Sequence, residues 1–162
     1  MITTSRSQFL LLSLLLSAAS LFAAKPNFSG EWKVDTAKSD FGDMPAPSEI
    51  VMQIEHVDPK VTMKQFQSGG PMGSMTADLT YMTDGTETKN KVRGTEIPST
   101  AKWSGDALKI TTKMSWQGNE VNITETWKLA SGGRNLELLR EMSSAQGSST
   151  MKLIFAKSDK SR

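Results

Sequence analysis

Four polar residues at nearly regular spacing are the part of this sequence best suited to chemistry. Ser99, Thr112, Glu125 and Arg140 each lie in a separate run of alternating apolar and polar residues within the stretch 98–157. Glycine-containing turns separate these runs, and a two-residue hairpin turn fixes which residues face each other. With each glycine-containing pair at a turn centre, the four residues fall opposite one another in this order. The sequence therefore predicts a polar row that crosses four strands on an otherwise apolar face.

Glu125 and Arg140 are the charged members of this row, and two roles remain open for them. A buried charge is costly unless it is paired, so they form either a mutual structural pair or the polar anchor of a binding cavity. A row of Thr112, Glu125 and Arg140 is also compatible with a neutral, hydroxyl-bearing ligand. As a third alternative, Glu125 acts as a general base, although pairing with Arg opposes the rise in its pKa that burial causes.

Other reactive residue types are scarce. The chain has no Cys and a single His, and no spacing of His or Cys indicates a metal site. His56 lies near the end of a predicted strand, where we expect a surface or hairpin-end residue. No Ser has an identifiable His partner, so we expect neither an enzyme nor a cofactor.

Ten short strands must position these residues. We expect the first five over 28–34, 48–56, 61–67, 74–82 and 86–92, and five more between 98 and 157. No helical period is present in 25–157. The sequence predicts an all-β, up-and-down antiparallel meander of about 8–10 strands, closed into a barrel that leaves no exposed edge.

Turn positions give a detailed register. They place Trp103 opposite Leu108, Trp127 opposite Leu138, and Leu138 opposite Phe155. Asp84-Gly85 predicts a further hairpin, and 93–98 is expected to be a looser link.

Residues on the inward face are too polar for a dry core and predict a cavity. Six methionines also project inward and suit a cavity that accepts varied apolar ligands, although gap-filling is the simpler role for each. The methionines are Met52, Met63, Met75, Met114, Met142 and Met151. The candidate ligand-binding residues are Gln65, Tyr81, Asn90, Thr112, Met114, Glu125, Trp127 and Arg140.

The first 24 residues have the pattern of a signal peptide. Arg6 supplies a basic start, an apolar run follows from Phe9 to Leu16, and Ala23-Ala24 precede Lys25. This run is too short to span a bilayer, so we expect an exported protein, periplasmic or secreted and bacterial. The predicted domain covers 25–157, and 158–162 form a polar tail. With 162 residues and a formal net charge of +2, nothing indicates nucleic acid as a partner, and we expect a monomer.

The segment Phe28-Ser29-Gly30-Glu31-Trp32 resembles the Gly-x-Trp signature of the lipocalins and fatty-acid-binding proteins, together called calycins. The resemblance implies a closed antiparallel barrel that binds small, mostly apolar molecules. It also implies that Trp32 plugs one end and that a late-strand Arg, Arg140 or less suitably Arg134, packs across it. In the fatty-acid-binding branch interior Arg residues hold a ligand carboxylate, a second role that Arg140 matches.

The chain departs from both branches. It has no room for two lid helices after Trp32, no Thr-Asp-Tyr motif and no C-terminal helix. It also resembles small exported bacterial proteins of lipocalin-like type. The resemblance implies a protein that binds a small hydrophobic or amphipathic ligand. The alternatives are a filled, protease-inhibitor-like barrel acting through loops such as 35–47 and 67–73, and an enzyme using Glu125.

Overall fold

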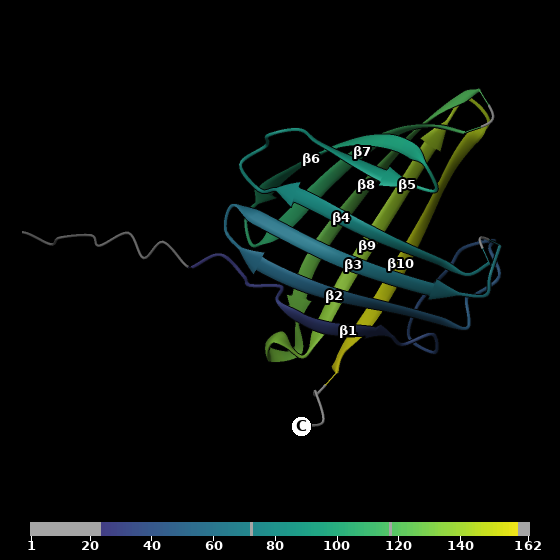
Figure 1. Ribbon diagram of the computed structural model, residues 1–162. Helices are drawn as coiled ribbons and strands as arrows, with labels where there is room; N and C mark the ends of the chain where they lie inside the picture. Colours follow the sequence, from purple (N-terminus) through teal and green to yellow (C-terminus); the bar gives the residue numbers. More distant parts are fainter. Residues whose placement is uncertain (1–23, 72, 117, 159–162) are drawn as a thin grey trace, which may run out of the picture.

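The computed structural model describes residues 24–71, 73–116 and 118–158, which form one antiparallel sheet curled into a nearly closed barrel (Figure 1). The strands are β1 (Gly30–Val34), β2 (Glu49–Val57), β3 (Lys60–Ser68), β4 (Met75–Met82), β5 (Thr88–Val92), β6 (Thr95–Ser104), β7 (Ala107–Trp116), β8 (Asn119–Ala130), β9 (Asn135–Ser144) and β10 (Gly147–Ser158). One 3-10 turn, Ser131–Gly133, joins β8 to β9. The predicted all-β meander of ten strands is confirmed.

The barrel closes where the first strand meets the last. β1 pairs with both β2 and β10, so the first and last strands lie next to each other in the sheet (Figure 1). The ends of the sheet are instead β4 and β5, which lie side by side without a backbone ladder between them. We call this junction the seam. The hairpin predicted at Asp84-Gly85 is therefore wrong: the chain turns there, but β5 does not pair with β4.

Side chains of β5 take the place of the missing ladder. Asn90 Oδ1 accepts a hydrogen bond from the Thr80 backbone N–H at 2.7 Å, and Asn90 Nδ2 donates to the Thr80 carbonyl at 3.0 Å. Thr88 Oγ1 donates to the same carbonyl at 2.7 Å. Because both backbone groups of Thr80 are satisfied in this way, the seam leaves that peptide with no unpaired polar group.

Several predicted pairings are confirmed, including Trp103 with Leu108, Trp127 with Leu138, and Glu125 with Arg140. Two hairpins are shifted by two residues. Thr112 lies opposite Ile123 rather than Glu125, whose partner across β7 is Ile110. In the last hairpin Leu138 faces Leu153, while Phe155 faces Leu136. The polar row is therefore broken between β7 and β8.

Turn chemistry explains both shifts. Gly118 is the second central residue of its turn rather than the first, because Trp116 pairs with Asn119. Gly147 follows its turn, because it pairs with Ser144. Glycine is tolerated at each of these positions, so its presence locates a turn only to within one residue. The link expected at 93–98 is a tight turn too, with positive φ at Arg93 and Gly94 and β6 starting at Thr95.

One end of the barrel is filled by large side chains from strands that are distant in sequence. Phe28, Trp32, Trp127, Leu136 and Phe155 are each at most 1% exposed. Phe28 packs edge-on against Trp127, with 5.7 Å between the ring centroids. We refer to this packed end as the plug.

Two expectations at the plug need correction. His56 lies at the hairpin end between β2 and β3, one of the two expected places, but it is buried rather than at the surface. It is 5% exposed and stacks on Phe28 at 5.8 Å and on Trp103 at 5.9 Å. Its Nδ1 accepts a hydrogen bond from the Phe28 backbone N–H at 3.3 Å. The cation across Trp32 is not an arginine, because Lys157 Nζ lies 5.2 Å from the centre of the Trp32 ring.

The long loop after β1 is tied to the outside of the barrel. Asp40 exchanges two backbone hydrogen bonds with Lys152 of β10, at 2.7 and 2.9 Å. Ser39 Oγ accepts a hydrogen bond from the Ile154 backbone N–H at 2.9 Å.

No helix within the described residues is long and apolar enough to cross a membrane. The predicted signal peptide, except Ala24, and residues 159–162 of the predicted tail lie outside the described residues, and Ser158 ends β10.

Candidate functional site

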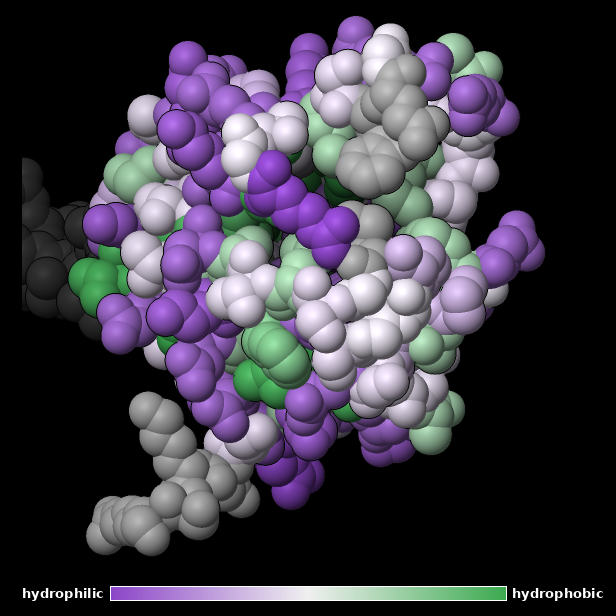
Figure 2. Space-filling view, turned by 45° about the vertical axis from the view of Figure 1, so that its right-hand side comes forward, coloured by the Kyte–Doolittle hydropathy of each residue, from purple (hydrophilic) through white to green (hydrophobic). Residues whose placement is uncertain are grey.

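A cavity of about 230 Å³ occupies the barrel end opposite the plug. The surface at this end is hollowed in Figure 2, with hydrophobic residues visible in the depth and hydrophilic residues around the opening. The lining residues are Met63, Gln65, Gln67, Met75, Ala77, Leu79, Tyr81, Val92, Arg93, Thr95, Ile97, Thr112, Met114, Ser115, Ile123, Glu125 and Arg140. The opening lies at the ends of β3, β5 and β7, where Arg93, Thr95 and Ser115 are exposed.

An ion pair lies among these lining residues. Arg140 Nε and Nη2 both donate to Glu125 Oε1, at 2.8 and 2.5 Å. The second carboxylate oxygen, Oε2, accepts a hydrogen bond from the Trp127 indole N–H at 3.0 Å. The nearby carboxylate of Glu125 raises the pKa of the Arg140 guanidinium, so this cation is firmly held in its charged form. Glu125 and Arg140 are therefore a mutual pair, and they also line the cavity.

Tyr81 lies beside this pair on β4. It is 5% exposed, and its ring is nearly perpendicular to that of Trp127, with 6.1 Å between the ring centroids. Burial, with a smaller effect of the Glu125 charge, raises the pKa of the Tyr81 hydroxyl well above its usual range. The hydroxyl makes no hydrogen bond to another described residue and is not sealed off from the cavity. A neutral phenol in this position can both donate and accept a hydrogen bond.

Six of the eight predicted ligand-binding residues line the cavity. These are Gln65, Tyr81, Thr112, Met114, Glu125 and Arg140. Thr112 reaches it despite the shifted register, and its hydroxyl is hydrogen-bonded to that of Ser99 at 2.8 Å. The other two lie elsewhere. The side-chain amide of Asn90 is hydrogen-bonded to Thr80 at the seam, and Trp127 is fully buried as part of the plug.

Three of the six predicted inward methionines line the cavity. Met63, Met75 and Met114 line the cavity, whereas Met52 and Met151 are buried in the core. Met142 is partly buried against the core. The apolar walls also include Leu79, Ile97 and Ile123, which were not singled out as site residues. Strand alternation assigns such residues to the interior, but it carries no signal for their height in the barrel.

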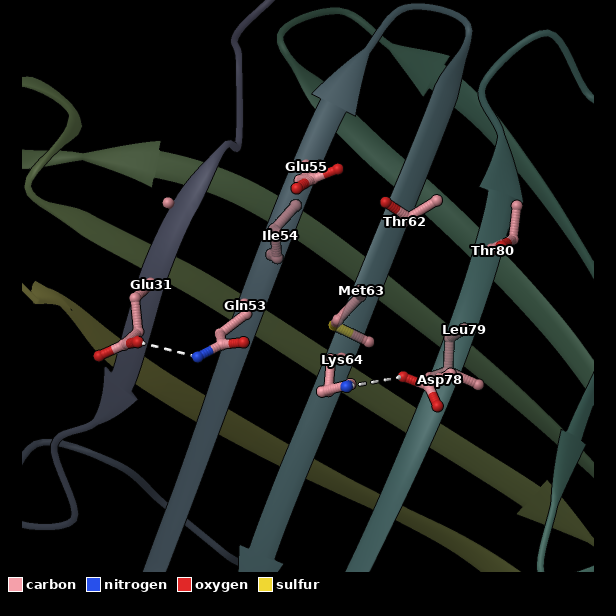
Figure 3. Close-up of a pocket in the computed structure, with 11 residues that line it drawn as sticks. Glu31, Gln53, Ile54, Glu55, Thr62, Met63, Lys64, Asp78, Leu79 and Thr80 are labelled. Atoms are coloured by element: carbon pink, nitrogen blue, oxygen red, sulfur yellow. Dashed lines mark hydrogen bonds and ion pairs between the residues drawn. The ribbon is translucent and has the colours of Figure 1, made fainter.

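A second depression lies on the outside of β1–β4 and is open to solvent (Figure 3). Gln53 donates to Glu31 Oε2 at 3.1 Å, and Lys64 lies 3.9 Å from Asp78. The polar side chains that Figure 3 labels belong to the solvated face of the sheet, because they alternate with the buried residues Ile54, Met63 and Leu79. We therefore place the candidate site inside the barrel.

The described residues offer little for catalysis. They hold no group of three or more His, Cys, Asp or Glu that could bind a metal ion. His56 lies in the plug, where its Nε2 is 3.5 Å from Asp58, and it does not line the cavity. Both oxygens of Glu125 already accept hydrogen bonds, one from Arg140 and one from the Trp127 indole.

Comparison with known proteins finds proteins of similar structure but none of similar sequence. No family model and no curated protein sequence matches the chain. A secretory abundant heat soluble protein of Ramazzottius varieornatus superimposes with a TM-score of 0.61 at 15% identity, covering 83% of this chain and 98% of that one. A second such protein, number 4, gives a TM-score of 0.55 at 12% identity, with coverages of 84% and 99%.

The zebrafish ileal bile acid-binding protein, solved with cholic acid, gives a TM-score of 0.56 at 15% identity, covering 81% of this chain and 98% of that one. None of these three proteins is described as an enzyme. At such low identities the likeness concerns the fold, and it matches the ten-stranded, nearly closed meander seen here. The chain therefore shares the fold of these three proteins, an antiparallel barrel of the kind that the resemblance of its Gly-x-Trp segment implied.

Proposed function

We propose that this chain is an exported barrel protein that binds a small, mostly hydrophobic molecule with one polar group in its interior cavity. The observation that carries the proposal is the lining of that cavity. Its walls are methionine and aliphatic side chains, while Tyr81, Gln65 and Arg140 bring polar atoms to the same space. Apolar walls with a few convergent polar groups are typical of small-molecule sites.

The fold supports the same conclusion. The zebrafish protein with this architecture was solved with cholic acid bound, which supports the proposal that a barrel of this fold holds a small molecule. The signal-peptide pattern of 1–24 supports export. The loop 35–47, through which an interaction module would act, is tied to β10 by Ser39 and Asp40.

The volume limits the ligand. A water molecule occupies about 30 Å³ of liquid, so about 230 Å³ corresponds to roughly eight non-hydrogen atoms. A larger molecule would have to extend through the opening between Thr95 and Ser115. At about 0.5 kcal/mol per atom, an eight-atom ligand would gain about 4 kcal/mol, which corresponds to a Kd of about 1 mM. Binding should therefore be measured at millimolar concentrations.

The test is an NMR titration of the ¹⁵N-labelled protein with six-carbon alcohols and amides, comparing wild type with a variant whose cavity is filled. Ala77 is buried and lines the cavity, so Ala77→Leu places three extra carbons inside it. Thr76→Leu is the matched control, because Thr76 is the next residue on β4 and faces outward. We expect saturable shifts of cavity residues in wild type and control, and their loss in Ala77→Leu. Unchanged binding by folded Ala77→Leu, or none by wild type, would refute the proposal.

A further inference from the structure

We infer that the cavity selects ligands whose polar group is uncharged and accepts a hydrogen bond, and that Glu125 excludes anions. This inference rests on the proposed function and specifies the ligand class. It reverses the carboxylate-holding role that the family resemblance suggested for Arg140. The argument depends on which donors face the cavity and on the net charge around them.

Two hydrogen-bond donors at the cavity have no protein partner among the described residues. Arg140 uses Nε and one N–H of Nη2 on Glu125, which leaves Nη1 without a hydrogen bond. The Tyr81 hydroxyl is unpartnered as well, although the residue is only 5% exposed. Both atoms are accessible from the cavity. If either were fully buried, it would be a buried polar atom without a partner, and the described residues contain no such atom. The cavity therefore offers two donors to a ligand oxygen.

The charges at this position cancel. Glu125 and Arg140 are 13% and 26% exposed, and their side chains are joined by two hydrogen bonds. Apart from Tyr81, the other ionisable lining residue is Arg93, which is exposed at the opening. A carboxylate brought to Arg140 would lose its hydration and would lie close to the negative charge of Glu125. The attraction to Arg140 would then be offset, and the desolvation cost would stay uncompensated.

A neutral carbonyl group meets none of these penalties. It has little hydration to lose compared with a carboxylate, and it accepts hydrogen bonds from Arg140 Nη1 and the Tyr81 hydroxyl. The Glu125–Arg140 pair can stay intact while it binds. An amide, ketone, ester or alcohol of about eight non-hydrogen atoms therefore fits the site better than an acid of the same size.

Hexanamide and hexanoate form a matched pair for the experiment, because they share shape and size and differ in charge at pH 7. Dissociation constants are measured by NMR titration of the ¹⁵N-labelled protein. For wild type we expect hexanamide to bind at least tenfold more tightly than hexanoate. In Glu125→Gln, which removes the negative charge and keeps the side-chain shape, we expect hexanoate to gain at least tenfold while hexanamide changes less than threefold.

Two further variants separate the causes. Glu120→Gln removes a charge from the exposed end of the same strand, and should leave both affinities unchanged. Tyr81→Phe removes only the hydroxyl, and should weaken hexanamide about three- to tenfold. Thermal unfolding of each variant establishes that it is folded, and the wild-type comparison needs no variant at all.

The outcomes distinguish this inference from the proposed function. If wild type binds hexanoate as tightly as hexanamide, the inference is wrong and the binding function stands. If the amide is preferred but Glu125→Gln leaves that preference unchanged, the role of Glu125 is refuted. If folded wild type binds neither probe, both proposals fall.

Discussion

The side chain of Asn90 should contribute more to stability than an asparagine side chain without hydrogen bonds, because it replaces backbone pairing at the seam between β4 and β5. It binds both the N–H and the carbonyl of Thr80, at 2.7 and 3.0 Å. In Asn90→Ala the Thr80 carbonyl keeps its bond from Thr88, but the Thr80 N–H loses the one acceptor it has among the described residues. An unpaired part-buried donor costs about 1–3 kcal/mol, and losing the second bond costs about 1 kcal/mol.

We therefore expect Asn90→Ala to lower the free energy of unfolding by about 2–4 kcal/mol, a large share of the stability of a small domain. The assay is urea unfolding followed by tryptophan fluorescence, with amide hydrogen exchange at Thr80. Asn122→Ala is the matched control, because Asn122 is a half-buried residue of β8 whose side chain makes no hydrogen bond within the described chain. Its effect should stay within about 0.5 kcal/mol.

In the variant Asn90→Asp the free energy of unfolding should depend on pH, and the hydrogen bonds of Asn90 determine the sign of that dependence. The carboxylate still accepts from the Thr80 N–H, but its other oxygen faces the Thr80 carbonyl, where Asn90 Nδ2 donates. The protonated acid restores that donor, so the pKa of the new side chain is raised in the folded state. The stability it contributes is present below the unfolded pKa of about 3.9 and is lost as pH rises through the folded pKa. The deficit relative to wild type should therefore be widest at neutral pH.

The reasoning about the seam would be refuted by either of two results. One is an Asn90→Ala variant no less stable than Asn122→Ala. The other is an unchanged exchange rate for the Thr80 amide in Asn90→Ala, because that amide would then have a different protecting partner.

Two further predictions concern the plug end of the barrel. The Thr83 hydroxyl donates to Asp58 Oδ1 at 2.6 Å and holds the pKa of Asp58 below its usual 3.8, so the stability from the ionised form is lost as pH falls through this lower pKa. Since Asp58 is 56% exposed, Asp58→Asn should cost at most about 1 kcal/mol at pH 7 in urea unfolding. The variant should match wild type once pH falls below the lowered pKa of Asp58, and a pH-independent gap would contradict this. Gly30 has φ +142, and an added Cβ would lie 2.6 Å from Lys157 Cε, so Gly30→Ala should lower the unfolding free energy by about 1–3 kcal/mol. In that background Lys157→Ala should recover only part of the loss, and full recovery would show that the backbone conformation is unstrained.

The pairing of Glu125 with Arg140 could be predicted because it depends on a single turn. Residues 131–134 separate β8 from β9, and the number of residues on either side fixes the register. The register between β7 and β8 failed, since Gly118 suits more than one turn position. That error was two residues, and side chains alternate with a period of two, so Thr112 remained on the inward face and still lines the cavity.

Asn90 shows where prediction from the sequence stops. Alternation correctly placed it inward, at 6% exposed, but its partner Thr80 is set by how the sheet closes. Nothing in 84–92 marks a missing ladder, because Asp84-Gly85 is an acceptable hairpin turn. The burial of His56 was missed for a related reason. Phe28 and Trp103, the rings that bury it, come from parts of the chain far from β2.

The sequence by itself determined the number of strands, their inward and outward faces, and the residue types available inside. These are local properties, since a strand alternates with a period of two whatever its neighbours do. Only the tertiary structure decided that β1 closes onto β10, that the seam falls between β4 and β5, and that the plug fills one end while Glu125, Arg140 and Tyr81 meet at a cavity near the other. The height of each residue along the barrel depends on strand tilt and stagger, which are fixed when distant strands pair and close the sheet.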